Sequence, residues 1–130
     1  MTQSEKLNQL KKYIEDNKLR DLRDTVDFDI EAEVYFLRED EGGRSTPAII
    51  GYRPNHLVRS DYLTSGLHVY LEQDYVFPGH FAKTRIKFIT PEIYPHCMDV
   101  GTKINVQEGS RIVGYAKVTK IFNKLLQISA

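Results

Sequence analysis

The chain has 130 residues, of which 41% are apolar and 28% charged, and its 18 Lys and Arg side chains are balanced by 18 Asp and Glu. A chain of this length fits one domain and can bury a core without disulfides or metals. Because the net charge is zero, composition does not indicate nucleic-acid binding, which would require a local basic patch.

The sequence carries no sign of a membrane or secretory segment. No stretch approaches about 18 consecutive apolar residues, so no transmembrane helix is expected. The N-terminus lacks the apolar stretch of a signal peptide. Cys97 is the single cysteine, which excludes an internal disulfide and suits a reducing compartment. We therefore expect a cytoplasmic protein that does not enter a membrane.

Residues 1–27 contain no glycine or proline and predict an N-terminal helical extension. Thr2 and Glu5 fit a capping box, with Ser4 as an alternative cap, and Asn17 is expected to weaken or end the helix. Apolar residues recur at spacings of three and four, the pattern of an amphipathic helix: Leu7, Leu10, Tyr13 and Ile14. Such a stripe favours packing on the chain's own domain, and the alternative is a helix presented to a partner.

From Phe28 the pattern changes to short strands, which predicts one domain over residues 28–130. Residues 29–37 alternate, with apolar side chains on one face. Glycine and proline turn signals separate five further strand candidates: residues 56–59, 66–73, 81–89, 102–109 and 111–122. Six short strands without helical crossovers predict an antiparallel barrel or sandwich.

Several motifs follow one another in this order: EVYFLREDEGGRSTP, GYRPN, FPG, ITPEI and VQEGSRIVGYAKVTKI. Together they resemble the C-terminal, third domain of elongation factor Tu, from about residue 28 to residue 121. The resemblance implies an all-β fold, a six-stranded antiparallel β-barrel, here with an added N-terminal α-helix. In that family the barrel has no catalytic residues. It helps to hold the T-stem of aminoacyl-tRNA, and it contacts the nucleotide-binding domain and the exchange factor.

The resemblance also implies a set of RNA contacts in this chain, namely Arg44, Thr64, Glu108 and Gly109. Possible additional contacts are Ser45, Asn55, Thr90, Arg53, Arg59 and Arg111. The family usually has histidine in place of Ser45, glutamine in place of Asn55 and a second glycine in place of Ser110. We therefore expect a tRNA surface that is partly kept and partly lost.

Two alternatives concern the charges of this surface. If it still binds RNA, the arginines should form a compact basic patch: Arg44, Arg53, Arg59 and Arg111. If it does not, Arg44 is expected to pair with one of the acidic residues 39–41, as surface cations commonly do.

Other chemistry finds little support in the sequence. No Gly-x-x-x-x-Gly-Lys-[Ser/Thr] loop is present, so GTP binding by that mechanism is not expected. His96 and Cys97 are adjacent, but side chains of neighbouring strand residues point to opposite faces. No second pair at metal-ligand spacing accompanies them, so neither a metal nor a cofactor is expected. His56, His68 and His80 are scattered without a matching pattern of Asp or Ser.

Three functions remain open at this point. The first is a translation-linked protein-interaction mimic or regulator that lacks GTPase activity, which we prefer because the missing GTPase domain removes the purpose of tRNA delivery. The second is a weak tRNA- or RNA-binding protein that uses the residual T-stem surface. The third, an enzyme, has no set of residues that points to it.

Overall fold

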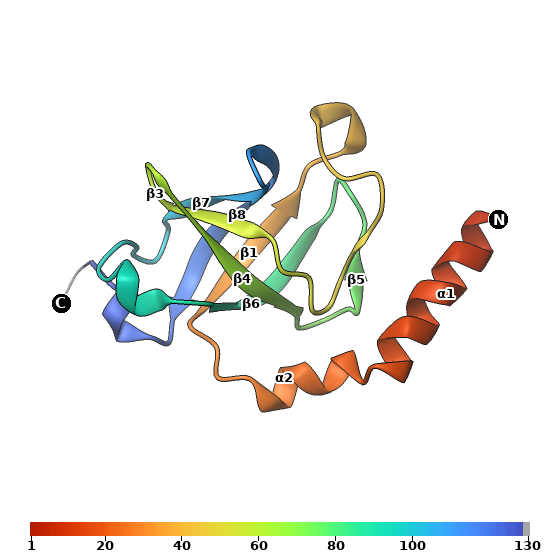
Figure 1. The fold of residues 1–130 in the computed structure, drawn as a ribbon, viewed down its shortest axis with the longest axis horizontal. Coiled ribbons are helices and arrows are strands. Elements are labelled where there is room, and N and C mark those ends of the chain that lie inside the picture. The colour runs from red at the N-terminus through yellow and green to blue at the C-terminus, as the bar shows by residue number, and fades with distance from the viewer. Residues whose placement is uncertain (129–130) are drawn as a thin grey trace.

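In the computed structural model, which describes residues 1–128, six strands close into an antiparallel barrel (Figure 1). Around the barrel the order is β1-β6-β4-β3-β7-β8, and β1 pairs with β8 to close it. The strands are β1 (Ile30–Phe36), β3 (Asn55–Arg59), β4 (Tyr62–Tyr70), β6 (Phe81–Phe88), β7 (Lys103–Glu108) and β8 (Arg111–Ile121). The predicted six-stranded barrel is thereby confirmed.

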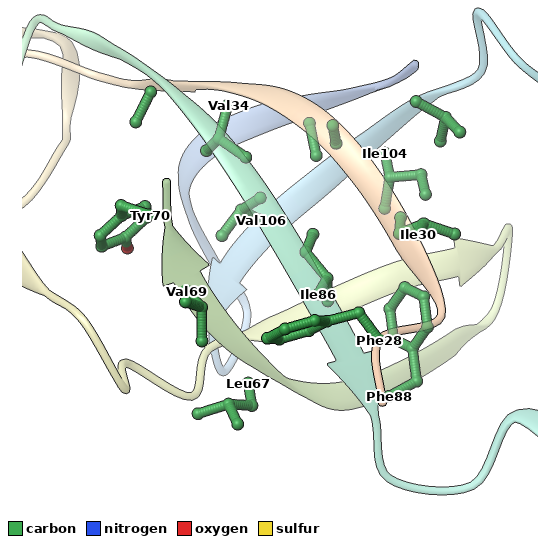
Figure 2. Packing of buried hydrophobic residues seen from close by; sticks show 14 of the residues in the cluster. Phe28, Ile30, Val34, Leu67, Val69, Tyr70, Ile86, Phe88, Ile104 and Val106 are labelled. Atoms are coloured by element: carbon green, nitrogen blue, oxygen red, sulfur yellow. The ribbon is translucent and has the colours of Figure 1, made fainter. Parts of the chain in front are cut away.

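Alternate side chains of the strands fill the barrel interior, among them Ile30, Ile86 and Val106 (Figure 2). Every second residue of β1 is buried, starting at Ile30, and the same alternation places Ile86 and Phe88 of β6 inside. Ile104 and Val106 of β7 lie in the same cluster. Burying side chains of this size contributes about 1.5–3 kcal/mol each. The alternation therefore sends the remaining residues of these strands to the outer surface.

A second, two-stranded ladder lies beside the barrel. It pairs β2 (Ala48–Ile49) with β5 (Tyr75–Val76). Sequence patterning missed both strands because two residues are too few to show an alternation. Three short 3-10 helices lie between the strands or after the last one: η2 (Glu39–Glu41), η3 (Pro91–Ile93) and η4 (Lys124–Leu126).

The N-terminal segment forms α1 (Gln3–Asp16), η1 (Leu19–Asp21) and α2 (Leu22–Thr25). The Thr2–Glu5 capping box is present, and the Asn17 side chain donates to the carbonyl of Tyr13 at 2.9 Å where α1 ends. Lys18 then takes a left-handed conformation, with φ of 52°. Because this conformation cannot continue an α-helix, the chain turns there toward the barrel.

The two helices meet the barrel differently. Arg23 of α2 donates to the carbonyls of Tyr70 and Gln73 at 2.8 and 2.7 Å, and to Asp74 at 2.9 Å. Of the α1 residues only Ile14 is buried, and Figure 1 shows α1 standing off from the strands beyond β5. The expected packing of the helix on the barrel thus holds for the end of α1 and not for its length.

Among residues 1–128 no helix is long and apolar enough to cross a membrane. The first barrel strand begins at Ile30 and the last ends at Ile121. The division of the chain at residues 27 and 28 stays a prediction, and the last two residues of the predicted range 28–130 lie outside the described part of the chain.

Candidate binding surface

Arg44, Tyr52 and Glu108 come together at one end of the barrel, and we call them the Arg44 cluster. Arg44 Nη1 and the Tyr52 hydroxyl both donate to Oε2 of Glu108. The Arg44 guanidinium also lies 4.6 Å from the centre of the Tyr52 ring, a cation–π contact. Arg44 therefore pairs with an acid far along the chain. Arg38 instead takes the nearby Asp40, at 2.9 Å.

Little of Arg44 is available to a further ligand. Its side chain is 20% exposed. Besides Glu108, its guanidinium donates to the carbonyl and hydroxyl of Thr46, at 3.3 and 3.2 Å, and to the carbonyl of Pro47 at 3.4 Å. A phosphate would have to displace Glu108 in order to take the strongest of these bonds.

The cluster is electrically balanced at neutral pH. Burial favours a protonated Glu108, but the hydrogen bonds from Tyr52 and Arg44 outweigh it and lower the pKa of this carboxyl. Burial and the bond to Glu108 raise the pKa of Tyr52, so its hydroxyl keeps its proton. One carboxylate thus faces one guanidinium, with Arg111 Nη2 a further cation at 4.0 Å from Glu108 Oε1.

The turn that follows Glu108 is held from the neighbouring strand. Gly109 is exposed and has φ of 62°, and its N–H donates to Asn55 Oδ1 at 3.2 Å. A side chain at this position would be strained in this backbone conformation. Ser110, the next residue, is exposed, and so is Ser45, which follows Arg44. The Gly109 N–H is therefore already used inside the protein.

The other predicted contacts lie apart from the cluster or inside the barrel. Thr64 is buried and its hydroxyl lies 2.9 Å from that of Tyr94, so it faces the interior. Arg59 is four residues along β3 from Asn55, about 13 Å, and donates to the carbonyl of Pro95. Thr90 follows the end of β6 and precedes η3.

Of the four arginines expected to form one basic patch, the structure brings two together. Arg44 and Arg111 both contact Glu108, and Arg111 also donates to the carbonyl of Gly43 at 3.3 Å. Arg53 is exposed just before β3, and Arg59 lies at the other end of that strand.

A groove of about 780 Å³ separates α1 from the part of the molecule that carries Arg44 and Tyr52. On the helix side it is lined by Gln3, Ser4, Lys6, Leu7, Gln9, Leu10 and Tyr13. On the barrel side it is lined by Arg44, Ser45, Thr46, Pro47, Ile49, Tyr52 and Phe77. The apolar stripe of α1 could be read from the sequence. On the opposite wall, Arg44 and Ser45 were predicted as RNA contacts and Phe77 belongs to the FPG motif, but nothing in the sequence placed them beside α1.

Two buried histidines form a pair inside the barrel. Nε2 of His56 and Nε2 of His68 are 2.8 Å apart, and the Nδ1 atoms face the Thr64 carbonyl and the Tyr70 hydroxyl at 3.3 and 3.4 Å. The carbonyl can only accept, so His56 carries its proton on Nδ1. His68 then donates from Nε2 and accepts from Tyr70. This directed chain satisfies every nitrogen with both rings neutral.

The pair is enclosed, since both rings are fully buried. Burial lowers the pKa of His56 to about 4 and that of His68 well below its usual value. No group of three or more His, Cys, Asp or Glu that could hold a metal occurs within residues 1–128. The pair is thus built as a neutral part of the core.

Comparison with protein-family models matches residues 23–122 to the elongation factor Tu C-terminal domain. The matched residues run from α2 to just past β8, so they include all six barrel strands and the Arg44 cluster. They leave out α1, which forms the other wall of the groove. The match confirms the resemblance that the sequence motifs indicate.

Proposed function

This chain belongs to the elongation factor Tu C-terminal domain family, and on that basis we propose that it is a non-catalytic protein-interaction module linked to translation. It carries a translation-factor-like barrel. In the proposed role it acts as a mimic or regulator that engages a protein component of the translation machinery, in the cytoplasm, without binding GTP.

The groove beside α1 is the observation that carries this proposal. Leu7 and Leu10 are half-exposed along the helix, and Phe77 is exposed on the opposite wall. An apolar groove between a helix and a barrel loop suits an apolar segment of a partner protein, because buried apolar and aromatic anchors supply most of the affinity of such interfaces.

The alternative function, weak binding of tRNA or another RNA, draws on the residual T-stem surface. Arg53 and Arg111 are exposed there and could meet phosphates. The Arg44 cluster argues against RNA binding here. Arg44, the cation that resemblance assigns to RNA, is already paired with Glu108. The N–H of Gly109 is likewise taken by Asn55. We therefore keep RNA binding through this surface as the second candidate.

The test is calorimetric titration of the full chain with purified elongation factor Tu and, separately, with its exchange factor. The groove variant is Leu7→Ala with Leu10→Ala, which keeps helix-forming residues in α1. We expect one component to bind, and the variant to weaken binding at least tenfold through lost apolar contact.

The matched control is Asn8→Ala with Lys11→Ala, two exposed residues of α1 that do not line the groove. This control should bind like the wild type. If neither translation component binds, or if the groove variant and the control lose affinity equally, the proposed protein-interaction role is wrong.

A further inference from the structure

The outer face of β6, β1, β8 and β7 gathers positive charge, although the whole chain is neutral. Strand pairing sets Lys83 opposite Glu33, Glu33 opposite Lys117, and Lys117 opposite Lys103, in one row across four strands. A second row follows with Arg85, Glu31 and Lys120. We call the six cations of this surface the lysine face: Lys83, Arg85, Lys87, Lys103, Lys117 and Lys120.

The lysine face has more cations than carboxylates. Three acids share it, Asp29, Glu31 and Glu33, which leaves an excess of three positive charges. Glu31 and Asp29 are buried against their cations. Glu31 lies 3.1 Å from Arg85 and 3.9 Å from Lys120, and Asp29 lies 3.6 Å from Lys87.

The first row is where the excess charge is most accessible. Lys83, Lys103 and Lys117 are all exposed. Within residues 1–128 neither Lys83 nor Lys117 has a carboxylate at ion-pair distance, and Lys103 lies over the Tyr115 ring at 4.1 Å. The ammonium groups of Lys83 and Lys117 can therefore meet anions from solvent, whereas that of Lys103 already contacts a ring.

Two exposed aromatic rings lie beside these two rows, Phe81 opposite Tyr35 and Phe122 next to Asp29. Phe81 is 60% exposed and rests against Tyr35, with ring centres 4.9 Å apart. Phe122 is 44% exposed, and the Arg85 guanidinium lies 5.3 Å from its centre. Phe81 and Arg85 are four residues apart on β6, which is about 13 Å. Both rings are open to solvent, and the cation–π contact places Arg85 beside Phe122.

From this juxtaposition we propose that the lysine face binds single-stranded nucleic acid, with the backbone phosphates on the ammonium groups and bases stacked on Phe81 and Phe122. Positive rows with flanking aromatic rings are what sequence-tolerant binding of single strands requires. A duplex keeps its bases stacked inside and would leave the two rings unused. No residue of this face lines the groove or belongs to the Arg44 cluster, so the inference does not rest on the function proposed above.

The experiment measures the fluorescence anisotropy of a labelled uridine decamer titrated with the full chain at several salt concentrations between 50 and 200 mM. Lys83→Gln with Lys117→Gln removes two proposed phosphate contacts at exposed positions. We expect at least tenfold weaker binding at 50 mM salt. The slope of log affinity against log salt should also fall by about 1.4, because each contact to a single strand contributes about 0.7.

The matched control is Lys11→Gln with Lys18→Gln, which removes the same charge from exposed residues of the N-terminal segment, outside the face and the groove. This control and Arg44→Ala should bind the decamer like the wild type. Phe81→Ala should weaken binding about fivefold or more without changing the salt slope, because stacking releases no counterions. Thermal unfolding of each variant checks that the barrel is intact.

Three results would overturn the inference. The first is no binding of the decamer at 50 mM salt. The second is equal loss in the lysine-face variant and in its charge-matched control, which would mean non-specific attraction. The third is displacement of the decamer by a glutamate decamer at the same concentration, which would identify an acidic protein segment as the partner. Because none of these results involves the groove variant, the protein-interaction role stands or falls separately.

Discussion

The role assigned to a residue from the sequence changes once its neighbours in the folded barrel are known. From the sequence, Arg44 follows a Gly-Gly turn, and resemblance assigns it to RNA. Its partner could not be foreseen, because Glu108 is separated from it by 64 residues and only the closed barrel brings the two turns together. Of the nearby acids 39–41, the expected partners, Asp40 pairs with Arg38, and Glu41 accepts from Tyr35 and from the Arg38 backbone.

The histidine pair was equally hidden. His56 and His68 lie on neighbouring strands of one hairpin, and both point inward among aromatic rings, with Phe88 5.4 Å from His56 and Phe36 6.3 Å from His68. In the sequence the two histidines are simply scattered. A polar residue at an inward position of a strand does not by itself predict its partner.

The pair predicts a loss of stability in mild acid. Burial depresses the pKa of both rings in the folded chain, from an ordinary value of 6.5 to about 4 for His56 and well below 6.5 for His68. The unfolded chain therefore binds more protons below pH 6.5, and the free energy of unfolding falls as pH drops. With two such histidines, the free energy of unfolding falls by up to about 2.7 kcal/mol per pH unit below pH 6.5.

Urea unfolding at intervals from pH 7.5 to pH 5 measures this loss. The range ends above the ordinary pKa of carboxyl groups, so their titration contributes little. His56→Leu with His68→Leu is the comparison variant. It lowers stability by leaving the Thr64 carbonyl and Tyr70 hydroxyl without these partners, but it should flatten the pH dependence between 6.5 and 5. An unchanged slope in the variant would show that other groups carry the acid sensitivity.

At the scale of elements, the strands followed from the sequence more closely than the N-terminal segment did. The six barrel strands show alternating apolar residues over five or more positions or end at clear turn signals. Residues 1–27 were predicted as one helical extension, and the structure divides them at Lys18 into α1 and a docked second part. Only Asn17 hinted at this break, because a left-handed lysine has no signature in sequence.

Arg23 is expected to fasten the docked part to the barrel. Arg23→Ala removes hydrogen bonds to two carbonyls and to Asp74, and should lower the free energy of unfolding by about 2–3 kcal/mol. Urea unfolding at pH 7 measures the change. The control Lys12→Ala on α1 removes an exposed pair with Asp16 and should change little. Equal stability of Arg23→Ala and the wild type would mean that the segment is held without Arg23, by its apolar contacts and by the ion pair between Arg20 and Asp74.

At the scale of the whole molecule, the sequence has no net charge, but charged and apolar side chains are distributed unevenly over the surface. The fold separates the groove, the Arg44 cluster and the lysine face, which share no residues except Arg44 and Tyr52 at the border of the groove. The family and barrel could be predicted from the ordered motifs. The surfaces could not, because each depends on residues that only strand register or chain packing brings together.

We propose that the ion pair between Arg44 and Glu108 occupies the surface that resemblance assigns to RNA, and that the groove is the functional site. Titration of aminoacyl-tRNA with wild type and Arg44→Ala across a salt series tests it most directly. We predict that any affinity, and its dependence on salt, is the same for both proteins. Salt-dependent binding that is lost in Arg44→Ala would contradict the account and show that Arg44 leaves Glu108 for a phosphate.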